Sequence, residues 1–183
     1  LAGHANVKGE IIRLDNNAAV STAYSTWTVD QGNVEKANQV TTAIRNVVLT
    51  YLQQRSGVEY LVLVGDDRAL PLRRVTDNTP RVSERTYKHT DVNNPTGAAL
   101  KSNYYLSDDY SGDREPTIHD GRELLIPDVA VGRLIESPSE MIVQIDAFLA
   151  KPVTEVENVL ITGYDFVQDV ATGDCDDWEA EFG

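Results

Sequence analysis

The chain has 183 residues, of which 41% are hydrophobic and 25% are charged, a balance typical of a soluble globular domain with a core of ordinary size. The formal net charge of −13 argues against nucleic acid as a partner, because phosphate backbones are bound by clustered Lys and Arg side chains. No apolar run approaches the roughly 20 residues that a membrane-spanning helix needs.

Three elements are predicted in the first third of the chain. Glu10 to Leu14 are predicted to form a short strand. A helix is predicted from about Asn33 to Gln54, because its apolar residues recur at steps of three and four and form one buried stripe. The stripe consists of Val34, Ala37, Val40, Ile44, Val47, Val48, Tyr51 and Leu52. Tyr60 to Val64 then form an unbroken apolar run ended by Gly65, which is typical of a parallel strand buried on both faces.

A long polar segment, from Leu72 to Leu124, separates this strand from the next one. Its length of about fifty residues is too great for a plain connection between two elements. We therefore expect residues 73–123 to be an insertion or long loop. A hairpin, a substrate-side insertion and a mobile lid all remain open.

The second half of the chain repeats the alternation of strand and helix. Val129 to Val131 are predicted to form a short buried strand that turns at Gly132. A helix is predicted to begin at Ser137, because an N-cap Ser, a Pro at the first helical position and a Glu three residues after the cap stand together. Its predicted inner face consists of Ile142, Ile145, Phe148 and Leu149. Asn158 to Thr162 are predicted to form another strand.

This order of elements predicts an α/β fold. Strands that alternate with helices form a mostly parallel sheet, and the connecting helices cover both faces of that sheet. We therefore expect a three-layer sandwich that carries a long polar insertion.

Acidic residues stand where the predicted strands end. Asp66 and Asp67 follow the first apolar strand, Asp165 follows strand 158–162, and Asp108 and Asp109 lie in the polar excursion. Ligands collect at the carboxyl ends of parallel strands, and carboxylate oxygens are the ligands that Ca²⁺ prefers. The other interpretation is that these Asp residues cap helices and stabilise turns. The sequence leaves both interpretations open, so calcium is a candidate ligand. We expect no cofactor to be required.

A cysteine nucleophile is not predicted in this chain. Cys175 is the single cysteine and is flanked by Asp174, Asp176 and Asp177, whose negative charge disfavours a thiolate. The three histidines, His4, His89 and His119, do not follow a predicted strand. We interpret Cys175 as an incidental thiol and the histidines as surface residues, and we predict no catalytic residue.

Four segments stand in order and at fitting distances along the chain. They are residues 60–67, Tyr-Leu-Val-Leu-Val-Gly-Asp-Asp, with Pro71 shortly after; residues 107–110, Ser-Asp-Asp-Tyr; residues 127–133, Pro-Asp-Val-Ala-Val-Gly-Arg; and the Ser-x-x-Glu-like helix start that follows. Together they resemble the gingipain family of cysteine peptidases. The first is similar to its strand-Gly-Asp-then-Pro segment, the second to its Ser-Asp-x-x-Tyr stretch, and the third to its strand ending in Gly-Arg. The resemblance extends from about Tyr60 to Asp165.

The resemblance implies a caspase-like fold and a parent that is an endopeptidase acting on peptides or proteins. In that family the catalytic Cys and His each follow a later strand. The sequence begins at Leu1 without an initiator Met and stops at Gly183 just after a predicted helix start, so we expect residues 1–183 to be the N-terminal part of such a domain. The resemblance also implies an extracellular or cell-surface location, calcium binding, and a substrate-binding role for Asp176.

Three hypotheses of function follow. The first is a peptidase fragment that supplies scaffold and part of the substrate-binding wall and that is inactive alone. The second is a non-catalytic calcium-binding or adhesion module of a surface protein. The third is a receiver-like phosphotransfer domain, suggested by the paired Asp66 and Asp67.

Overall fold

The computed structural model describes residues 1–78, 94–115, 117–119, 121–152, 172–173, 175–177 and 180. The chain divides into two compact units, Leu1–Ile145 and Asp146–Gly183. The first unit contains the strands and helices described below, and only the last helix, α5 (Pro138–Ala150), continues into the second unit.

Two helices precede the first strand. The side chain of Asn17 caps α1 (Ala18–Trp27) by accepting from the backbone N–H of Val20 at 3.1 Å. Asn33 caps α2 (Val34–Gln54) in the same way. Helix α2 confirms the prediction for residues 33–54. The strand predicted at residues 10–14 was wrong, because these residues form no strand, and helix α1 was not predicted.

The parallel sheet predicted from the two apolar runs is present as a pair of strands. Strand β1 (Tyr60–Val64) lies beside β6 (Ala130–Leu134), in register from Tyr60 opposite Ala130 to Val64 opposite Leu134. Helices and a small parallel sheet are together compatible with the predicted α/β fold. The strand predicted at residues 158–162 lies outside the described residues.

The polar excursion contains two antiparallel strand pairs, which agrees with the hairpin alternative, while a substrate-side insertion and a mobile lid stay predictions. Strand β2 pairs with β3 and β4 pairs with β5, and two short helices lie between or beside them. The elements are β2 (Arg73–Thr76), α3 (Pro95–Lys101), β3 (Tyr104–Ser107), α4 (Asp109–Gly112), β4 (Thr117–His119) and β5 (Arg122–Leu124). Residues 79–93 lie outside the described residues.

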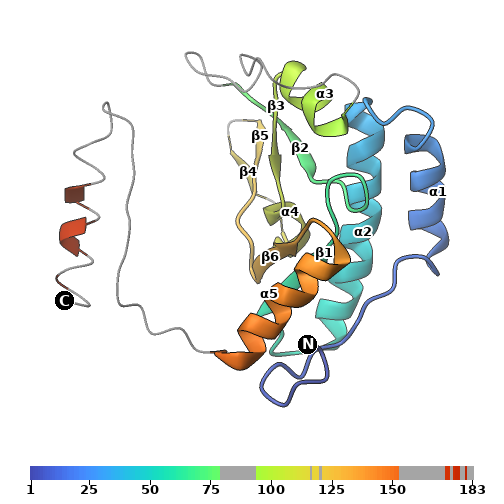
Figure 1. The fold of residues 1–183 in the computed structure, drawn as a ribbon. Helices are drawn as coiled ribbons and strands as arrows, with labels where there is room; N and C mark the ends of the chain where they lie inside the picture. Colours follow the sequence, from blue (N-terminus) through green and yellow to red (C-terminus); the bar gives the residue numbers. More distant parts are fainter. Residues whose placement is uncertain are drawn as a thin grey trace. The chain divides into compact units, whose positions relative to one another are not determined.

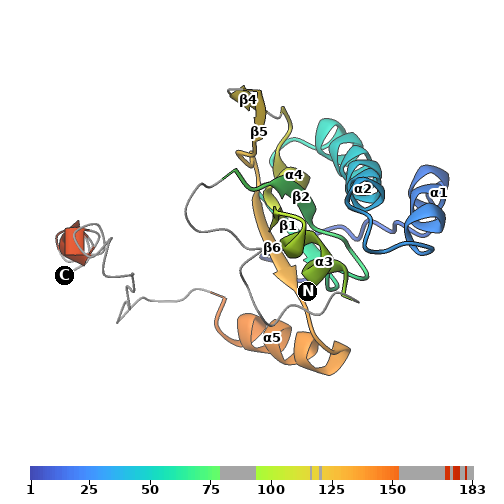
Figure 2. The same cartoon turned by 90° about the horizontal axis from the view of Figure 1, so that it is seen from above.

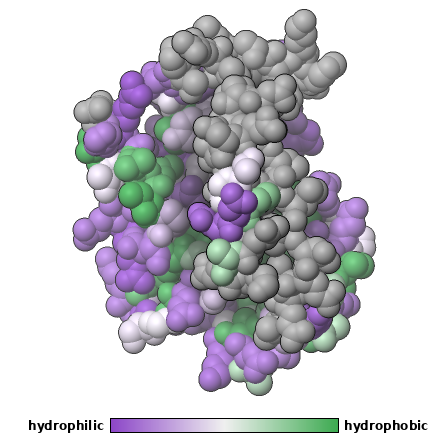
Figure 3. Space-filling view, turned by 90° about the vertical axis from the view of Figure 1, so that its left-hand side faces the viewer, coloured by the Kyte–Doolittle hydropathy of each residue, from purple (hydrophilic) through white to green (hydrophobic). Residues whose placement is uncertain are grey.

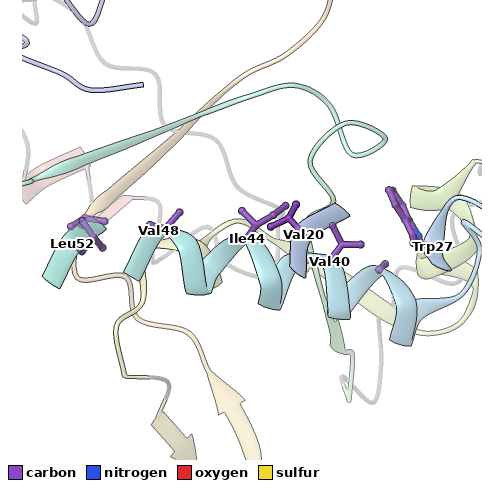
Figure 4. Close-up of a cluster of buried hydrophobic side chains, with 8 residues drawn as sticks. Val20, Trp27, Val40, Ile44, Val48 and Leu52 are labelled. Atoms are coloured by element: carbon purple, nitrogen blue, oxygen red, sulfur yellow. The ribbon is translucent and has the colours of Figure 1, made fainter. Parts of the chain in front are cut away.

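The core is built on α2, which lies between α1 and the strands (Figures 1 and 2). Five members of the predicted stripe are buried: Ala37, Val40, Ile44, Val48 and Leu52. They pack with Val20 and Trp27 of α1 and with Val129, which directly precedes β6 (Figure 4). The helical periodicity therefore identified the core face correctly.

Helix α5 begins as the sequence predicts. The backbone N–H of Ser137 donates to Glu140 at 3.0 Å, and the Ser137 hydroxyl accepts from the backbone N–H of Glu140 at 3.4 Å, which is a reciprocal capping box. The Ser137 hydroxyl also donates to the Glu140 carboxylate, and this bond, together with the one from the Ser137 backbone N–H, lowers the pKa of the Glu140 carboxyl. The predicted inner face is not buried, however: Ile145 and Leu149 are partly covered, whereas Ile142 and Phe148 are exposed. None of the helices in the described part of the chain is long and apolar enough to cross a bilayer.

One face of the parallel pair is exposed in the part of the chain that the structure describes. Tyr60, Val62 and Val64 alternate along β1 and are 73%, 46% and 58% exposed, whereas Leu63 on the opposite face is buried. Gly132 of β6 stands opposite Val62 and adds no side chain to this face. Apolar side chains also lie exposed among polar ones on the surface in Figure 3. An open apolar face is unusual for parallel strands, which are normally covered on both sides.

The position of the core on α2 predicts that two substitutions in this helix change the free energy of unfolding by very different amounts. Ile44→Ala removes a side chain that is only 4% exposed and should lower the free energy of unfolding by about 2–5 kcal/mol, since a cavity remains. Gln53→Ala, on the exposed side of the same helix, should change it by less than about 0.5 kcal/mol. Denaturant unfolding of both variants measures the difference, and equal losses would contradict the core assignment.

Candidate functional site

The candidate site is the carboxyl end of the parallel strand pair. The backbone N–H of Gly65 donates to the carbonyl of Leu134 at 2.8 Å and makes the last contact between the two strands. Residues 65–70, which we name the β1 loop, then turn away from the sheet. In open α/β sheets this edge is where ligands bind, so the contacts of the β1 loop decide what the edge is able to do.

A glycine and an aspartate fold the β1 loop on itself. Gly65 has a φ of +131°, and a Cβ at this position would lie 2.9 Å from the Cβ of Ala69. The Oδ1 atom of Asp66 accepts from the backbone N–H groups of Arg68 and Ala69, both at 3.0 Å. Asp66 is exposed and performs the turn-stabilising role that was one of the two alternatives for it.

Asp67 is buried and paired with Arg74. Its two oxygens accept from the two terminal nitrogens of Arg74, each at 2.7 Å. It also accepts from the backbone N–H of Leu72 at 2.9 Å and from the hydroxyl of Thr96 at 2.9 Å. Four hydrogen bonds thus satisfy this carboxylate, as a buried charge requires.

Asp108 is paired with Arg133, and the same arginine holds the β1 loop. The Nε and Nη2 atoms of Arg133 donate to the two oxygens of Asp108 at 2.8 and 2.5 Å. Its Nη1 donates to the carbonyls of Gly65 at 2.6 Å and Leu70 at 2.9 Å. The structure therefore brings Asp66, which lies in the loop, and Asp108, through Arg133, to one region.

The other predicted site residues have separate surroundings. Asp109 accepts from the hydroxyl of Ser107 at 3.0 Å at the start of α4. Asp176 is exposed and belongs to the second unit, and Asp165 lies outside the described residues. Among the described residues, no group of three or more His, Cys, Asp or Glu side chains is arranged to hold a metal ion. Calcium binding and the role of Asp176 stay predictions.

The cysteine and the histidines are placed as follows. Cys175 is a free, exposed thiol in the second unit. The Nδ1 atom of His4 accepts from the backbone N–H of Asn6 at 3.3 Å, and His119 is exposed on β4. His89 lies outside the described residues.

Sequence reasoning missed the two arginines that partner the acidic residues. The signal was present: Arg74 and Arg133 stand next to apolar residues in strands, and a charged side chain in such a place requires a partner. The spacing gave no indication of which acid each one reaches. A second feature was not predicted from the sequence: Arg45 and Arg73 both stack on the ring of Tyr110, with their Cζ atoms 4.8 and 4.2 Å from the ring centroid.

Tyr24 of α1 holds the β1 loop from another side. Its hydroxyl donates to the carbonyl of Ala69. Burial raises the pKa of Tyr24 to about 12, and the positive charge of Arg133 opposes this shift. The phenol therefore stays protonated and remains a donor at neutral pH.

An open groove of about 1270 Å³ lies between α1 and α2. Several of its hydroxyl groups already donate to carbonyls within the helices, among them those of Thr26, Thr42 and Thr50. Its lining includes neither His nor Cys. The described lining of the groove thus offers no Cys–His pair.

The geometry of the β1 loop predicts that replacing two glycines by Ala has unequal effects on the free energy of unfolding. Gly65→Ala should lower the free energy of unfolding by about 1–3 kcal/mol, because its φ is strained for any L side chain and its Cβ meets Ala69. Gly132→Ala should be neutral or slightly stabilising, since a Cβ there meets nothing within 4 Å. Thermal or denaturant unfolding compares them, and a harmless Gly65→Ala would contradict the loop geometry.

The raised pKa of Tyr24 predicts a dependence of stability on pH. The folded pKa of about 12 exceeds the ordinary value of 10.0, so ionisation favours the unfolded chain. The stabilisation is complete below about pH 10 and is lost as the pH rises toward 12. The stability difference between wild type and Tyr24→Phe should therefore shrink over this interval. The Tyr60→Phe variant, changed at an exposed position, should have the same pH dependence of stability as the wild type. If the stability difference between wild type and Tyr24→Phe stays constant over this interval, the assignment of the raised pKa to Tyr24 is refuted.

Comparison with known families agrees with the resemblance described above. Residues 10–166 match the sequence model of Peptidase family C25. No curated protein and no solved structure gives a significant match to the chain. The family match includes α1, α2, both strands of the parallel pair and the β1 loop. Since it covers most of the sequence, the chain belongs to Peptidase family C25, the gingipain family of cysteine peptidases.

Proposed function

We propose that this chain is the scaffold part of a gingipain-like cysteine endopeptidase, with the catalytic Cys and His supplied by sequence that follows Gly183. The family match over residues 10–166 carries this proposal. Cys175 is exposed and flanked by acidic residues, an environment that disfavours a nucleophilic thiolate. The chain is therefore expected to be inactive by itself.

The proposed fold of the complete domain is a three-layer, caspase-like sandwich. Helix α2 covers one face of the β1–β6 pair, and the row formed by Tyr60, Val62 and Val64 leaves the other face apolar and exposed. Parallel strands are stable when helices cover both faces. The proposed architecture therefore places a second helical layer over this row.

The proposed substrates are peptides or proteins, as the family implies, and the β1 loop forms part of the wall of their binding site. The loop is held by Arg133 and Tyr24, so it offers a fixed surface at the edge where ligands of α/β sheets bind. Asp176 is proposed to contact a basic substrate side chain, because its carboxylate is exposed and negatively charged. An extracellular or cell-surface location is proposed on the family resemblance alone.

Calcium is retained as a proposed ligand. The carboxylates of Asp67 and Asp108 are already paired with arginines, so an ion is expected to use Asp66, Asp109 or Asp165. The alternative function, a non-catalytic calcium-binding or adhesion module, predicts that added Ca²⁺ raises the Tm and that the following sequence lacks the Cys and His. The receiver-like hypothesis loses support, because Asp67 is buried against Arg74 and is not accessible to a phosphoryl donor.

Peptide hydrolysis tests the proposed function. The 183-residue chain and a longer polypeptide that continues through the next Cys and His are assayed with Arg- and Lys-containing peptides. Only the longer polypeptide should show sustained turnover, and Cys175→Ala should leave that turnover unchanged. Turnover by the 183-residue chain that Cys175→Ala abolishes would overturn the proposal.

The role of Asp176 has its own matched control. In the active polypeptide, Asp176→Asn should lower kcat/KM for basic substrates by about tenfold, which corresponds to about 1.4 kcal/mol of lost interaction. Asp177→Asn removes the same charge from the neighbouring exposed residue and should have little effect. Equal effects of the two substitutions would show that only the general acidity of this segment matters.

A further inference from the structure

Arg133 joins the two ends of the β1 loop with one nitrogen. Its Nη1 donates to the carbonyls of Gly65 and Leu70, the first and last residues of the loop, at 2.6 and 2.9 Å. The other side of the guanidinium is fixed by Asp108 through two parallel hydrogen bonds. The side chains of Arg133 and Asp108 are only 11% and 22% exposed, so water competes weakly for these contacts.

The sequence separation of these groups explains why the bridge matters. Asp108 is 25 residues from Arg133, and Gly65 is 68 residues away. The loop itself contains hydrogen bonds from the N–H groups of Ala69 and Leu70 to the carbonyl of Asp66, at 3.1 and 2.8 Å. These local bonds shape the turn, and the backbone N–H of Gly65 joins its start to Leu134 of β6. Among the hydrogen bonds of the described residues, those of Arg133 tie the end of the turn, at Leu70, to β6 and to the segment before α4.

We infer that Arg133 is a positioning residue of the peptidase, which fixes the β1 loop at the carboxyl end of the parallel strands, and that Asp108 orients Arg133 for this task. The inference rests on the proposed function, in which the loop lines the substrate site. Arg133 is not itself a substrate ligand, because four of its five N–H donors are engaged within the chain. It acts through the loop, since a small displacement of a positioned wall weakens substrate binding.

Lysine is not expected to replace Arg133. The bridge requires one planar group to donate to a carboxylate on one side and to two carbonyls on the other. A Lys ammonium has the charge but not the fork, so Arg133→Lys keeps the charge balance of the site while losing the geometry. Asp108→Asn does the reverse: it keeps the planar guanidinium of Arg133 but removes the negative charge of its partner.

The pair formed by Arg73 and Glu123 is a matched control. It is also bidentate, with a closest distance of 2.8 Å, and its side chains are 16% and 26% exposed. None of the hydrogen bonds described for Arg73 goes to a carbonyl of the β1 loop. Glu123→Gln therefore removes a comparable ion pair without touching the loop.

Amide hydrogen exchange of the 183-residue chain tests the bridge without requiring any enzyme activity. Arg133→Lys should raise the exchange rates of the Ala69 and Leu70 amides at least about tenfold, while the buried part of α2 keeps its rates. Asp108→Asn should raise them less, and Glu123→Gln should leave them unchanged. If Arg133→Lys does not fold, the comparison of Asp108→Asn with Glu123→Gln decides. The inference would be overturned if the exchange rates rose uniformly over the whole chain, or if the loop amides exchanged at the same rate in the variants and the wild type.

Kinetics of the longer, active polypeptide tests the link to the substrate. Arg133→Lys should raise KM more than it lowers kcat, because a displaced wall weakens binding more than chemistry. Glu123→Gln should change neither constant. A loosened loop with unchanged KM in an active enzyme would refute the positioning role. Absence of activity in every extended polypeptide would refute the proposed function instead, and the exchange result would still stand.

Discussion

The buried ion pair between Asp67 and Arg74 fixes the course of the chain where it leaves the parallel strands. The two side chains are 9% and 1% exposed, and removing two charges from water costs several kcal/mol for each ion. Such a pair is tolerated only when its geometry is good and its remaining hydrogen-bonding groups are satisfied. Here the backbone N–H of Leu72 and the hydroxyl of Thr96 donate the remaining hydrogen bonds to the Asp67 carboxylate. The segment before β2 and the start of α3 are therefore both attached to Asp67.

The same pair is connected to the core through α2. The side-chain amide of Asn38 donates to the carbonyl of Arg74 at 2.9 Å and accepts from its backbone N–H at 2.8 Å. The start of β2 is therefore attached to the helix that carries the apolar stripe. Together with the Arg133 bridge, this arrangement fixes the end of the sheet by charge pairs as well as by the apolar core, and the proposed substrate-binding wall depends on it.

Much of the fold was predictable because its signals are local. The apolar run at Tyr60–Val64, the stripe of α2 and the capping box of α5 each depend on residues that are close in sequence. The strand predicted at residues 10–14 failed because a short apolar run has no preference for a strand unless a neighbour pairs with it. Ile11 in that segment is exposed. Helix α1 was missed because only Val20 and Trp27 are buried, which leaves almost no periodic signal.

The site was predictable only in part, for a related reason. Acidic residues after strands were recognised as candidates, but their partners are set by tertiary structure: Arg74 follows Asp67 by seven residues, whereas Arg133 follows Asp108 by 25 residues. No local pattern separates a carboxylate that binds an ion from one that is paired with a buried arginine. In the structure, Asp67 and Asp108 are each paired with an arginine, and their calcium binding stays a prediction.

A double-mutant cycle at Asp67 and Arg74 tests most directly whether buried charge pairs hold the platform. Each single substitution, Asp67→Asn or Arg74→Met, leaves one buried charge without its partner and should lower the free energy of unfolding by about 3–5 kcal/mol. The double variant removes both charges and is expected to be more stable than either single variant, with a coupling energy above about 2 kcal/mol. Additive losses, or single variants as stable as the wild type, would contradict the account.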